Sequence, residues 1–269
     1  MKKKISIIGI PTDINSSFAR GAAKAPQKIM HEFRSEATNT FSENGINTAS
    51  HGKYIFHQLD NHMSDKTEFD FIKNSIEKEL KSGNNCISLG GDHSITYPII
   101  SAHSQLYPKL NIIHIDAHPD LYDDFDGNPF SHASPFARIL ENNLAHSLTQ
   151  FGIRTMNDHQ EKQANRFNVV VHTMRDHHLN DKIKLHFEDP IYISIDMDGL
   201  DPAFAPGVSH PEPGGLSTRD VINIIAGIKG EVIGADIVEY NPLKDINDIT
   251  GVTAAKLLKE LMGKILEHI

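Results

Sequence analysis

The sequence predicts an α/β fold, a single domain over residues 1–269 in which helices cover both faces of a mostly parallel sheet. Three observations support this prediction. Short, almost wholly apolar runs recur along the chain, amphipathic stretches of helical periodicity separate them, and no break in composition marks a linker or an internal repeat. A strand that is buried on both faces is apolar throughout, and such strands are typical of parallel sheets in three-layer α/β/α proteins.

Seven apolar runs are predicted to be the strands. They are residues 5–10, 86–89, 111–115, 146–152, 168–171, 191–195 and 232–238. The first run ends at Pro11, which makes it too short for the apolar region of a secretory signal peptide or for a membrane span. We therefore expect a cytoplasmic protein with no membrane partner.

Three segments between or after these runs are predicted to be helices. Apolar residues recur at helical spacing over 69–80 and stop before Gly83. The tetrapeptide Ser-Thr-Arg-Asp at 217–220 has the pattern of a capping box ahead of a helix over 221–228. Apolar residues over 254–266 predict a closing helix.

Charge and cysteine content narrow the class of protein. The net charge of −9 argues against nucleic acid as a partner, because nucleic-acid-binding proteins need a basic face. The single cysteine, Cys86, excludes an intrachain disulfide and lies in an apolar run, so we expect a buried, inert thiol.

Three of the predicted strands end in clusters of aspartate and histidine. These are Gly-Gly-Asp-His-Ser at 90–94, Asp-Ala-His-Pro-Asp at 116–120 and Asp-Met-Asp at 196–198. Alternate residues of an extended chain face the same way, and parallel strands end at one edge of the sheet, where such folds bind ligands. The pattern therefore predicts that these side chains converge.

The converging set holds four carboxylates and two imidazoles: His93, Asp116, His118, Asp120, Asp196 and Asp198. Carboxylates this close cannot all stay ionised without a cation. Mixed oxygen and nitrogen ligands favour Mn²⁺ over structural zinc, and paired metals in hydrolases lie about 3.5–4 Å apart. We therefore predict two Mn²⁺ ions per chain.

The three clusters resemble the metal motifs of the ureohydrolase family, which contains the arginases and agmatinases. The resemblance runs from Pro11 to the C-terminus, and the segments 116–140, 196–220, 234–242 and 253–261 look most like plant-type arginases. This resemblance implies an arginase-like fold, assembly into homotrimers or homohexamers, and hydrolysis of a guanidino group with release of urea.

The resemblance also implies residue roles. Asp116 and Asp196 would bridge the two ions, with His93 and Asp120 completing one site and His118 and Asp198 the other. His132 matches a histidine outside the ligand set that shuttles protons, and Glu239 matches the carboxylate that pairs with the substrate guanidinium. Asp120 could relay a proton from the attacking hydroxide, and imidazole titrates near the working pH.

The far end of the substrate decides which guanidino compound is used. The resemblance favours L-arginine, giving L-ornithine and urea, with agmatine or another guanidino or formimino compound as the alternative. Asn128 and Ser131 are candidates to bind an α-carboxylate. Asn157 stands where animal-type arginases carry an aspartate for the α-amino group, which puts recognition of that group in doubt.

Two other classes of protein share part of this pattern. A zinc deacetylase would hold one metal ion and would have no use for Glu239, and a metal-binding scaffold without activity would have lost ligands, whereas all six are present. The remaining histidines have weaker signals. His210 is expected to be structural or to lie at the rim of the pocket. We expect surface positions for His51, His57, His62, His172, His177 and His178.

Overall fold

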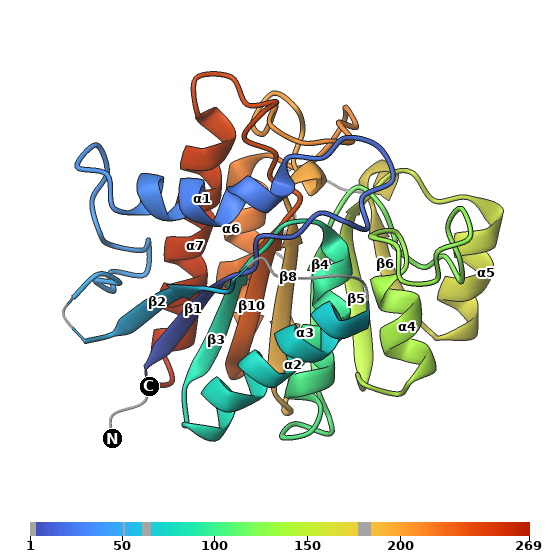
Figure 1. The fold of residues 1–269 in the computed structure, drawn as a ribbon, viewed down its shortest axis with the longest axis horizontal. Coiled ribbons are helices and arrows are strands. Elements are labelled where there is room, and N and C mark those ends of the chain that lie inside the picture. Colours follow the sequence, from blue (N-terminus) through green and yellow to red (C-terminus); the bar gives the residue numbers. More distant parts are fainter. Residues whose placement is uncertain (1–3, 51, 61–65, 177–183) are drawn as a thin grey trace.

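The computed structural model describes residues 4–50, 52–60, 66–176 and 184–269, and its centre is one eight-stranded sheet (Figure 1). The strand order is β2-β1-β3-β10-β8-β4-β5-β6, and every neighbouring pair is parallel. The strands are β1 (Ile5–Gly9), β2 (Tyr54–Gln58), β3 (Asn85–Leu89), β4 (Asn111–Ile115), β5 (Ser147–Ile153), β6 (Val170–Thr173), β8 (Ile191–Asp196) and β10 (Val232–Val238). A second, two-stranded pair joins β7 (Leu185–His186) to β9 (Ile228–Lys229).

Helices cover both faces of the sheet, which confirms the predicted α/β fold. They are α1 (Ala25–Phe33), α2 (Lys66–Lys81), α3 (Thr96–His103), α4 (Pro135–Glu141), α5 (Asp158–Arg166), α6 (Thr218–Gly227) and α7 (Ile249–Leu266). One apolar core joins α1, α6 and α7 to the sheet, and a second joins α2, α3, α4 and α5 to its other face. The two cores lie on opposite faces of the sheet, so the fold has three layers, with the sheet between two layers of helices.

All seven predicted strands form, although the predicted run at 168–171 becomes a strand only from Val170. The three predicted helices form as α2, α6 and α7, and Ser217 and Asp220 make the predicted capping box with both reciprocal hydrogen bonds. Strand β2 is an additional strand at the edge of the sheet. Cys86 is buried as expected, and burial raises the pKa of its thiol.

Four central strands deliver their following residues to the same edge of the sheet. In spatial order β3 leads to His93, β10 leads to Glu239, β8 ends at Asp196 and β4 leads to Asp116. Close packing of the connecting loops requires glycine here, since a Cβ on Gly91 would lie 1.4 Å from a backbone oxygen of the loop after β1. The topology therefore gathers the predicted ligands from distant parts of the sequence.

Two further predictions concern the surface. Among the described residues, none of the helices has the length and apolar character needed to cross a bilayer. Of the histidines expected on the surface, His172 is exposed and stacks on Phe151, and His57 is half-buried. His51, His62, His177 and His178 lie outside the described residues.

Candidate metal centre

His93 lies buried at the centre of the site, among three carboxylates. It opens the short 3₁₀ turn after β3, and its ring is fully buried. Three carboxylate oxygens surround its Nδ1 atom: Oδ2 of Asp116 at 3.2 Å, of Asp120 at 3.0 Å and of Asp196 at 3.2 Å. Within the described chain, this nitrogen has no hydrogen bond of acceptable geometry. A buried nitrogen facing three acceptors fits a position where a cation binds between them.

A hydrogen-bond chain behind His93 orients its ring. Ser194 donates its hydroxyl proton to the buried carboxylate of Asp236 at 2.6 Å, and Asp236 also accepts from Thr96 and Tyr192. Because that proton is committed, the Ser194 oxygen accepts from Nε2 of His93 at 3.0 Å. The lone pair for metal binding is therefore left on Nδ1, as histidine ligands commonly require.

His118 forms the second half of the centre. Its Nδ1 lies 3.4 Å from Oδ1 of Asp116 and 3.3 Å from Oδ2 of Asp198. Asp116 thus faces His93 with one oxygen and His118 with the other, as a carboxylate shared between two ions would. All six predicted ligands lie in this one cluster.

The charges in the cluster are unbalanced without a cation. Burial, together with Asp198 and Asp116, raises the pKa of Asp196 well above its usual range. Burial also raises the pKa of Asp198 to about 6. Burial opposes a charge on His93, but its carboxylate neighbours raise the pKa of this histidine well above 6.5. Divalent cations would relieve this repulsion, so the donor set fits the predicted metal ions.

Glu239 and His132 lie beside the metal cluster. Glu239 follows β10 with a left-handed backbone (φ 61°), and its Oε1 accepts from the His93 backbone N–H at 2.9 Å and from Nδ1 of His132 at 3.1 Å. Nε2 of His132 lies 2.8 Å from the hydroxyl of Ser17. Burial opposes charge on His132, but the hydrogen bond and the charge of Glu239, together with Asp120 and Asp92, outweigh burial and raise the pKa of His132 to about 9. In the protein without metal ions, His132 is therefore a cation at neutral pH.

A cavity of about 240 Å³ opens over this cluster. The described residues that line it are four of the predicted ligands, then His132 and Glu239, and in addition Ser17, Tyr122, Phe125, Ala133, Thr155, Gln160 and His210. The structure places His210 on the cavity wall, with its ring 5.1 Å from that of His132. Pockets for drug-sized ligands measure about 300–1,000 Å³, so this one suits a small substrate.

Comparison with known proteins places the chain in a family. The model of the arginase family matches residues 3–263. Arginase 1, mitochondrial, of Arabidopsis thaliana is 42% identical over 98% of this chain and 82% of its own length. The chain belongs to the arginase family. It is therefore an arginase-family hydrolase.

Other relatives show how broad the family is. The solved arginase from Medicago truncatula superposes with a TM-score of 0.93 at 39% identity, over 98% of this chain and 87% of that one. The N(1)-aminopropylagmatine ureohydrolase of Thermus thermophilus is 32% identical over 97% of this chain and 89% of its own length. Arginases and hydrolases of agmatine derivatives thus share the fold, and the metal cluster alone does not decide the substrate.

The names of the plant relatives also correct one expectation. The arginases of Arabidopsis thaliana and Medicago truncatula are named mitochondrial or chloroplastic, which points to an organelle, so the expectation of a cytoplasmic protein is wrong. That expectation rested on finding no long apolar segment near the start of the sequence. Organellar transit peptides are amphipathic and rich in arginine and serine, so a search for apolar segments does not detect them.

Asn128 and Ser131, the residues predicted to bind an α-carboxylate, form hydrogen bonds within the protein instead. Asn128 donates to the side-chain oxygen of Asn15 at 3.1 Å and accepts from the backbone N–H of Phe130 at 2.9 Å. Ser131 is buried and accepts from the backbone N–H of Ala133 at 3.3 Å. Neither is among the described residues that line the cavity, and both instead hold the loop after Asp120 in shape.

Asn157 caps a helix. Its Oδ1 accepts from the backbone N–H of Gln160 at 3.0 Å, and its Nδ2 donates to the hydroxyl oxygen of Tyr122 at 2.6 Å. Asn157 is not among the described residues that line the cavity, and the lining residues that the sequence analysis missed are Ser17, Tyr122, Phe125, Ala133, Thr155 and Gln160. Tyr122 carried no usable signal, because Asp120 has a left-handed backbone (φ 50°) and the alternation of an extended chain does not continue through it.

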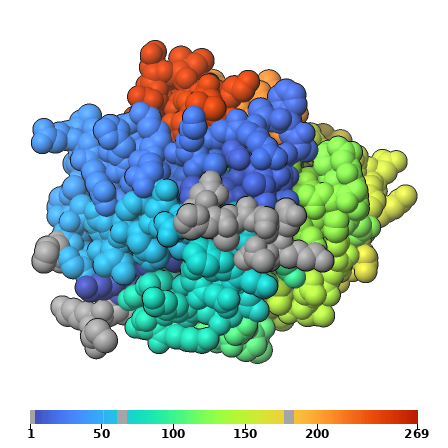
Figure 2. All heavy atoms as spheres, viewed as in Figure 1, coloured from blue at the N-terminus to red at the C-terminus, as the bar shows by residue number. Residues whose placement is uncertain are grey.

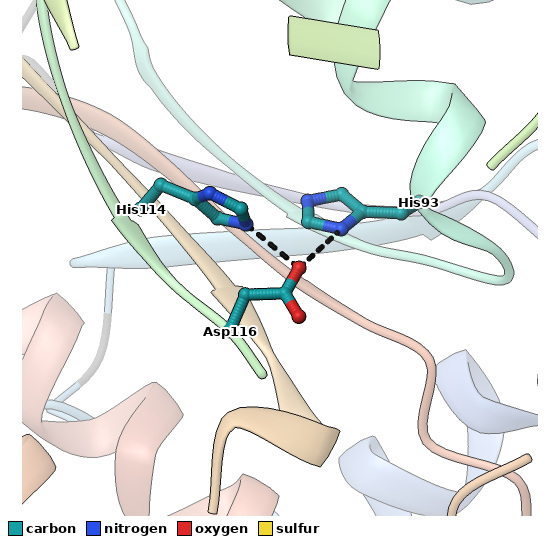
Figure 3. A group of neighbouring side chains, drawn as sticks. All are labelled: His93, His114 and Asp116. Atoms are coloured by element: carbon teal, nitrogen blue, oxygen red, sulfur yellow. Dashed lines mark hydrogen bonds and ion pairs between the residues drawn. The ribbon is translucent and has the colours of Figure 1, made fainter. Parts of the chain in front are cut away.

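The sequence analysis also missed His114, a histidine beside the predicted ligands. It lies two residues before Asp116 on β4 and is fully buried, and the same alternation could have indicated it. Figure 3 shows His114, His93 and Asp116 pointing toward one another, with both imidazoles reaching the same carboxylate oxygen. The three are close enough together to hold an ion.

Proposed function

We propose that this arginase-family hydrolase uses two Mn²⁺ ions to hydrolyse L-arginine to L-ornithine and urea. One observation carries the proposal. The six predicted ligands form one cluster, in which Asp116 faces His93 on one side and His118 on the other. Four of the six, His118, Asp120, Asp196 and Asp198, line a small cavity that Glu239 also lines. His93, Asp116, Asp120 and Asp196 would hold one ion, and Asp116, His118, Asp196 and Asp198 the other.

Glu239 provides the site for the guanidinium group. Both hydrogen bonds to Glu239 within the described chain reach Oε1, so Oε2 can accept from a guanidinium N–H at the cavity. Burial raises the pKa of Glu239, but the hydrogen bond and charge of His132, together with the backbone N–H and the charge of His93, outweigh burial and lower this pKa, so the group is a carboxylate at neutral pH. A charge-assisted bond of this kind orients a planar cation.

The reaction needs a strong nucleophile and an acid. A guanidinium carbon is a poor electrophile, and divalent ions held by the six predicted ligands would lower the pKa of a bound water molecule so that it is deprotonated at neutral pH. Asp120 borders the cavity, and its carboxylate can take up the remaining proton of the attacking group. His132 holds a proton at Nδ1 against Glu239 and can pass it to the leaving amine.

The preference for L-arginine rests on the relatives named arginases at 42% and 39% identity. Agmatine is the second candidate, because the 32% identical relative acts on an agmatine derivative. The test is kcat/KM for L-arginine, agmatine, guanidinobutyrate and formiminoglutamate with Mn²⁺ present. We expect L-arginine to exceed agmatine by at least about tenfold, and a preference for agmatine would refute the substrate while leaving the metal centre in place.

Metal analysis tests the binuclear centre separately. We expect two equivalents of Mn²⁺ per chain, and loss of both metal and activity in Asp116→Ala. Saturation at one equivalent would refute the two-metal site.

The predicted trimer or hexamer is supported by exposed apolar residues before and within α7, in the segment that projects at the top of Figure 2: Leu243, Ile246, Ile249 and Val252. Analytical ultracentrifugation measures the assembly directly.

A further inference from the structure

A histidine that the predicted ligand set leaves out stands directly behind the centre. Nε2 of His114 lies 2.8 Å from Oδ2 of Asp116, the oxygen that also lies 3.2 Å from Nδ1 of His93 (Figure 3). Distance alone would allow His114 to bind a metal ion with these two residues. Its other hydrogen bonds decide whether it is a ligand or a support for the ligands.

Gln150 on β5 supplies the deciding contact. Its side-chain nitrogen donates to the backbone oxygen of Pro119 at 2.7 Å, and because a carbonyl oxygen can only accept, the amide orientation is fixed. The same nitrogen lies 2.9 Å from Nδ1 of His114. Nδ1 must therefore accept, and the neutral imidazole carries its hydrogen on Nε2, where it points at Asp116. A ring nitrogen that carries hydrogen has no lone pair for a metal ion.

We propose that His114 is a positioning residue that fixes the carboxylate of Asp116, and that Gln150 selects the imidazole tautomer it needs. The inference rests on the two-metal centre proposed above. Oδ2 of Asp116 accepts from His114, and Oδ1 accepts from the backbone N–H of His118 at 2.7 Å. Both oxygens of the shared carboxylate are thus held, and the ring of Phe136, 4.0 Å from that of His114, fixes the imidazole plane.

Metal binding separates a support from a ligand. We compare His114→Leu, which removes the donor, with His114→Gln, whose amide N–H can reach the same carboxylate oxygen. His103→Leu is the matched control, because His103 is also fully buried but its ring packs on Tyr192. Mn²⁺ affinity is measured by competition with a chelator, and the number of ions by metal analysis.

The expected pattern is specific. His114→Leu should keep two ions per chain but bind them about 10- to 100-fold more weakly, the usual effect of losing a partner behind a metal ligand. His114→Gln should recover most of that affinity, and His103→Leu should bind Mn²⁺ like the wild type. Unchanged affinity in His114→Leu would refute the positioning role. A count that falls to one ion in both His114 variants would make His114 a ligand.

A second readout needs no metal. In protein labelled with ¹⁵N-histidine and stripped of metal, the His114 signals, assigned by their loss in His114→Gln, should show hydrogen on Nε2. Gln150→Leu should abolish this fixed tautomer. Hydrogen on Nδ1 in the wild type would overturn the inference. A wild-type count below two Mn²⁺ would refute the proposed centre instead, and the tautomer measurement would still decide the role of Gln150.

Discussion

The pairing of His132 with Glu239 makes the stability of the metal-free protein depend on pH. His132 has an ordinary pKa of 6.5 that rises to about 9 in the fold, and its side chain is only 12% exposed, so solvent screens the pair weakly. The difference between 6.5 and about 9, at about 1.4 kcal/mol per pH unit, corresponds to about 3 kcal/mol. The lowered pKa of Glu239 describes the same contact and is not added.

The sign follows from the direction of the shift. A histidine whose pKa is higher in the folded state contributes its full stabilisation below pH 6.5 and loses it as the pH rises through about 9. We therefore expect the difference in unfolding free energy between wild type and His132→Gln to shrink by about 3 kcal/mol from pH 6 to pH 10. The assay is urea unfolding of metal-free protein, because bound cations would oppose charge on His132.

Glu239→Gln is the control for this prediction. It removes the carboxylate that raises the pKa of His132 most, but leaves Asp120 and Asp92, which also raise it. In its background, the effect of His132→Gln on stability should therefore depend on pH much less than in the wild-type background. A pH-independent difference in the wild-type background would refute the pairing, as would an NMR titration that gives His132 a pKa below 7. In the metal-loaded enzyme, His132→Gln should lower kcat by about 10²-fold or more, the scale of general acid–base help.

Three further predictions concern the backbone at Glu239, the half-buried Arg154 and the predicted metal ligands. The unfolding free energy of Glu239→Gly, measured in urea, should exceed that of Glu239→Ala by about 1 kcal/mol. Both variants lose the carboxylate, but only glycine adopts φ 61° without strain. Equal unfolding free energies would contradict the backbone strain. Arg154 donates to five backbone carbonyls, among them those of Asp198 and the two residues after it. Arg154→Lys keeps the charge but not the planar guanidinium, so it should lower the unfolding free energy by at least about 2 kcal/mol. An unchanged urea midpoint would contradict this. Mn²⁺ binding at pH 7 should release protons, because carboxylate neighbours raise the pKa values of His93 and His118 despite their burial. Calorimetry in buffers of different ionisation enthalpy measures this release, and a binding enthalpy that is the same in every buffer would contradict it.

The strands with apolar sequences were predictable, including the edge strand β6 with its two valines, whereas the edge strand β2 was not. The central strands are buried on both faces, so Val232–Val238 is apolar enough to be predicted residue for residue. Strand β2 lies at the edge of the sheet, none of its residues is buried, and its mixed sequence at Tyr54–Gln58 resembles a loop. Edge strands take their conformation from pairing with a neighbour, here β1, and that information is not local.

The site divides in the same way. The predicted metal ligands could be found because parallel strands end at one edge of the sheet. The strand β4 ends at Ile115 and does not continue past Ala117 as expected, so alternation along a strand does not place Asp116, His118 and Asp120, which lie in the following loop. The substrate end depends on loops, where a polar side chain can bond to the backbone instead of facing the cavity. Asn128 and Ser131 stabilise such a loop, while Tyr122 and Gln160 reach the cavity wall. Residue type alone does not distinguish these outcomes.

The centre combines features that each oppose folding, and this links metal binding to stability. Asp120 and Glu239 hold left-handed backbone conformations, which cost a residue other than glycine about 1–2 kcal/mol each. Burial and neighbouring carboxylates raise the pKa values of Asp196 and Asp198, so these groups are harder to ionise in the fold than in the unfolded chain. Divalent cations favour the ionised carboxylates that the fold alone disfavours. The free energy of metal binding therefore adds to that of folding, and the residues that cost most stability are those that the proposed chemistry needs.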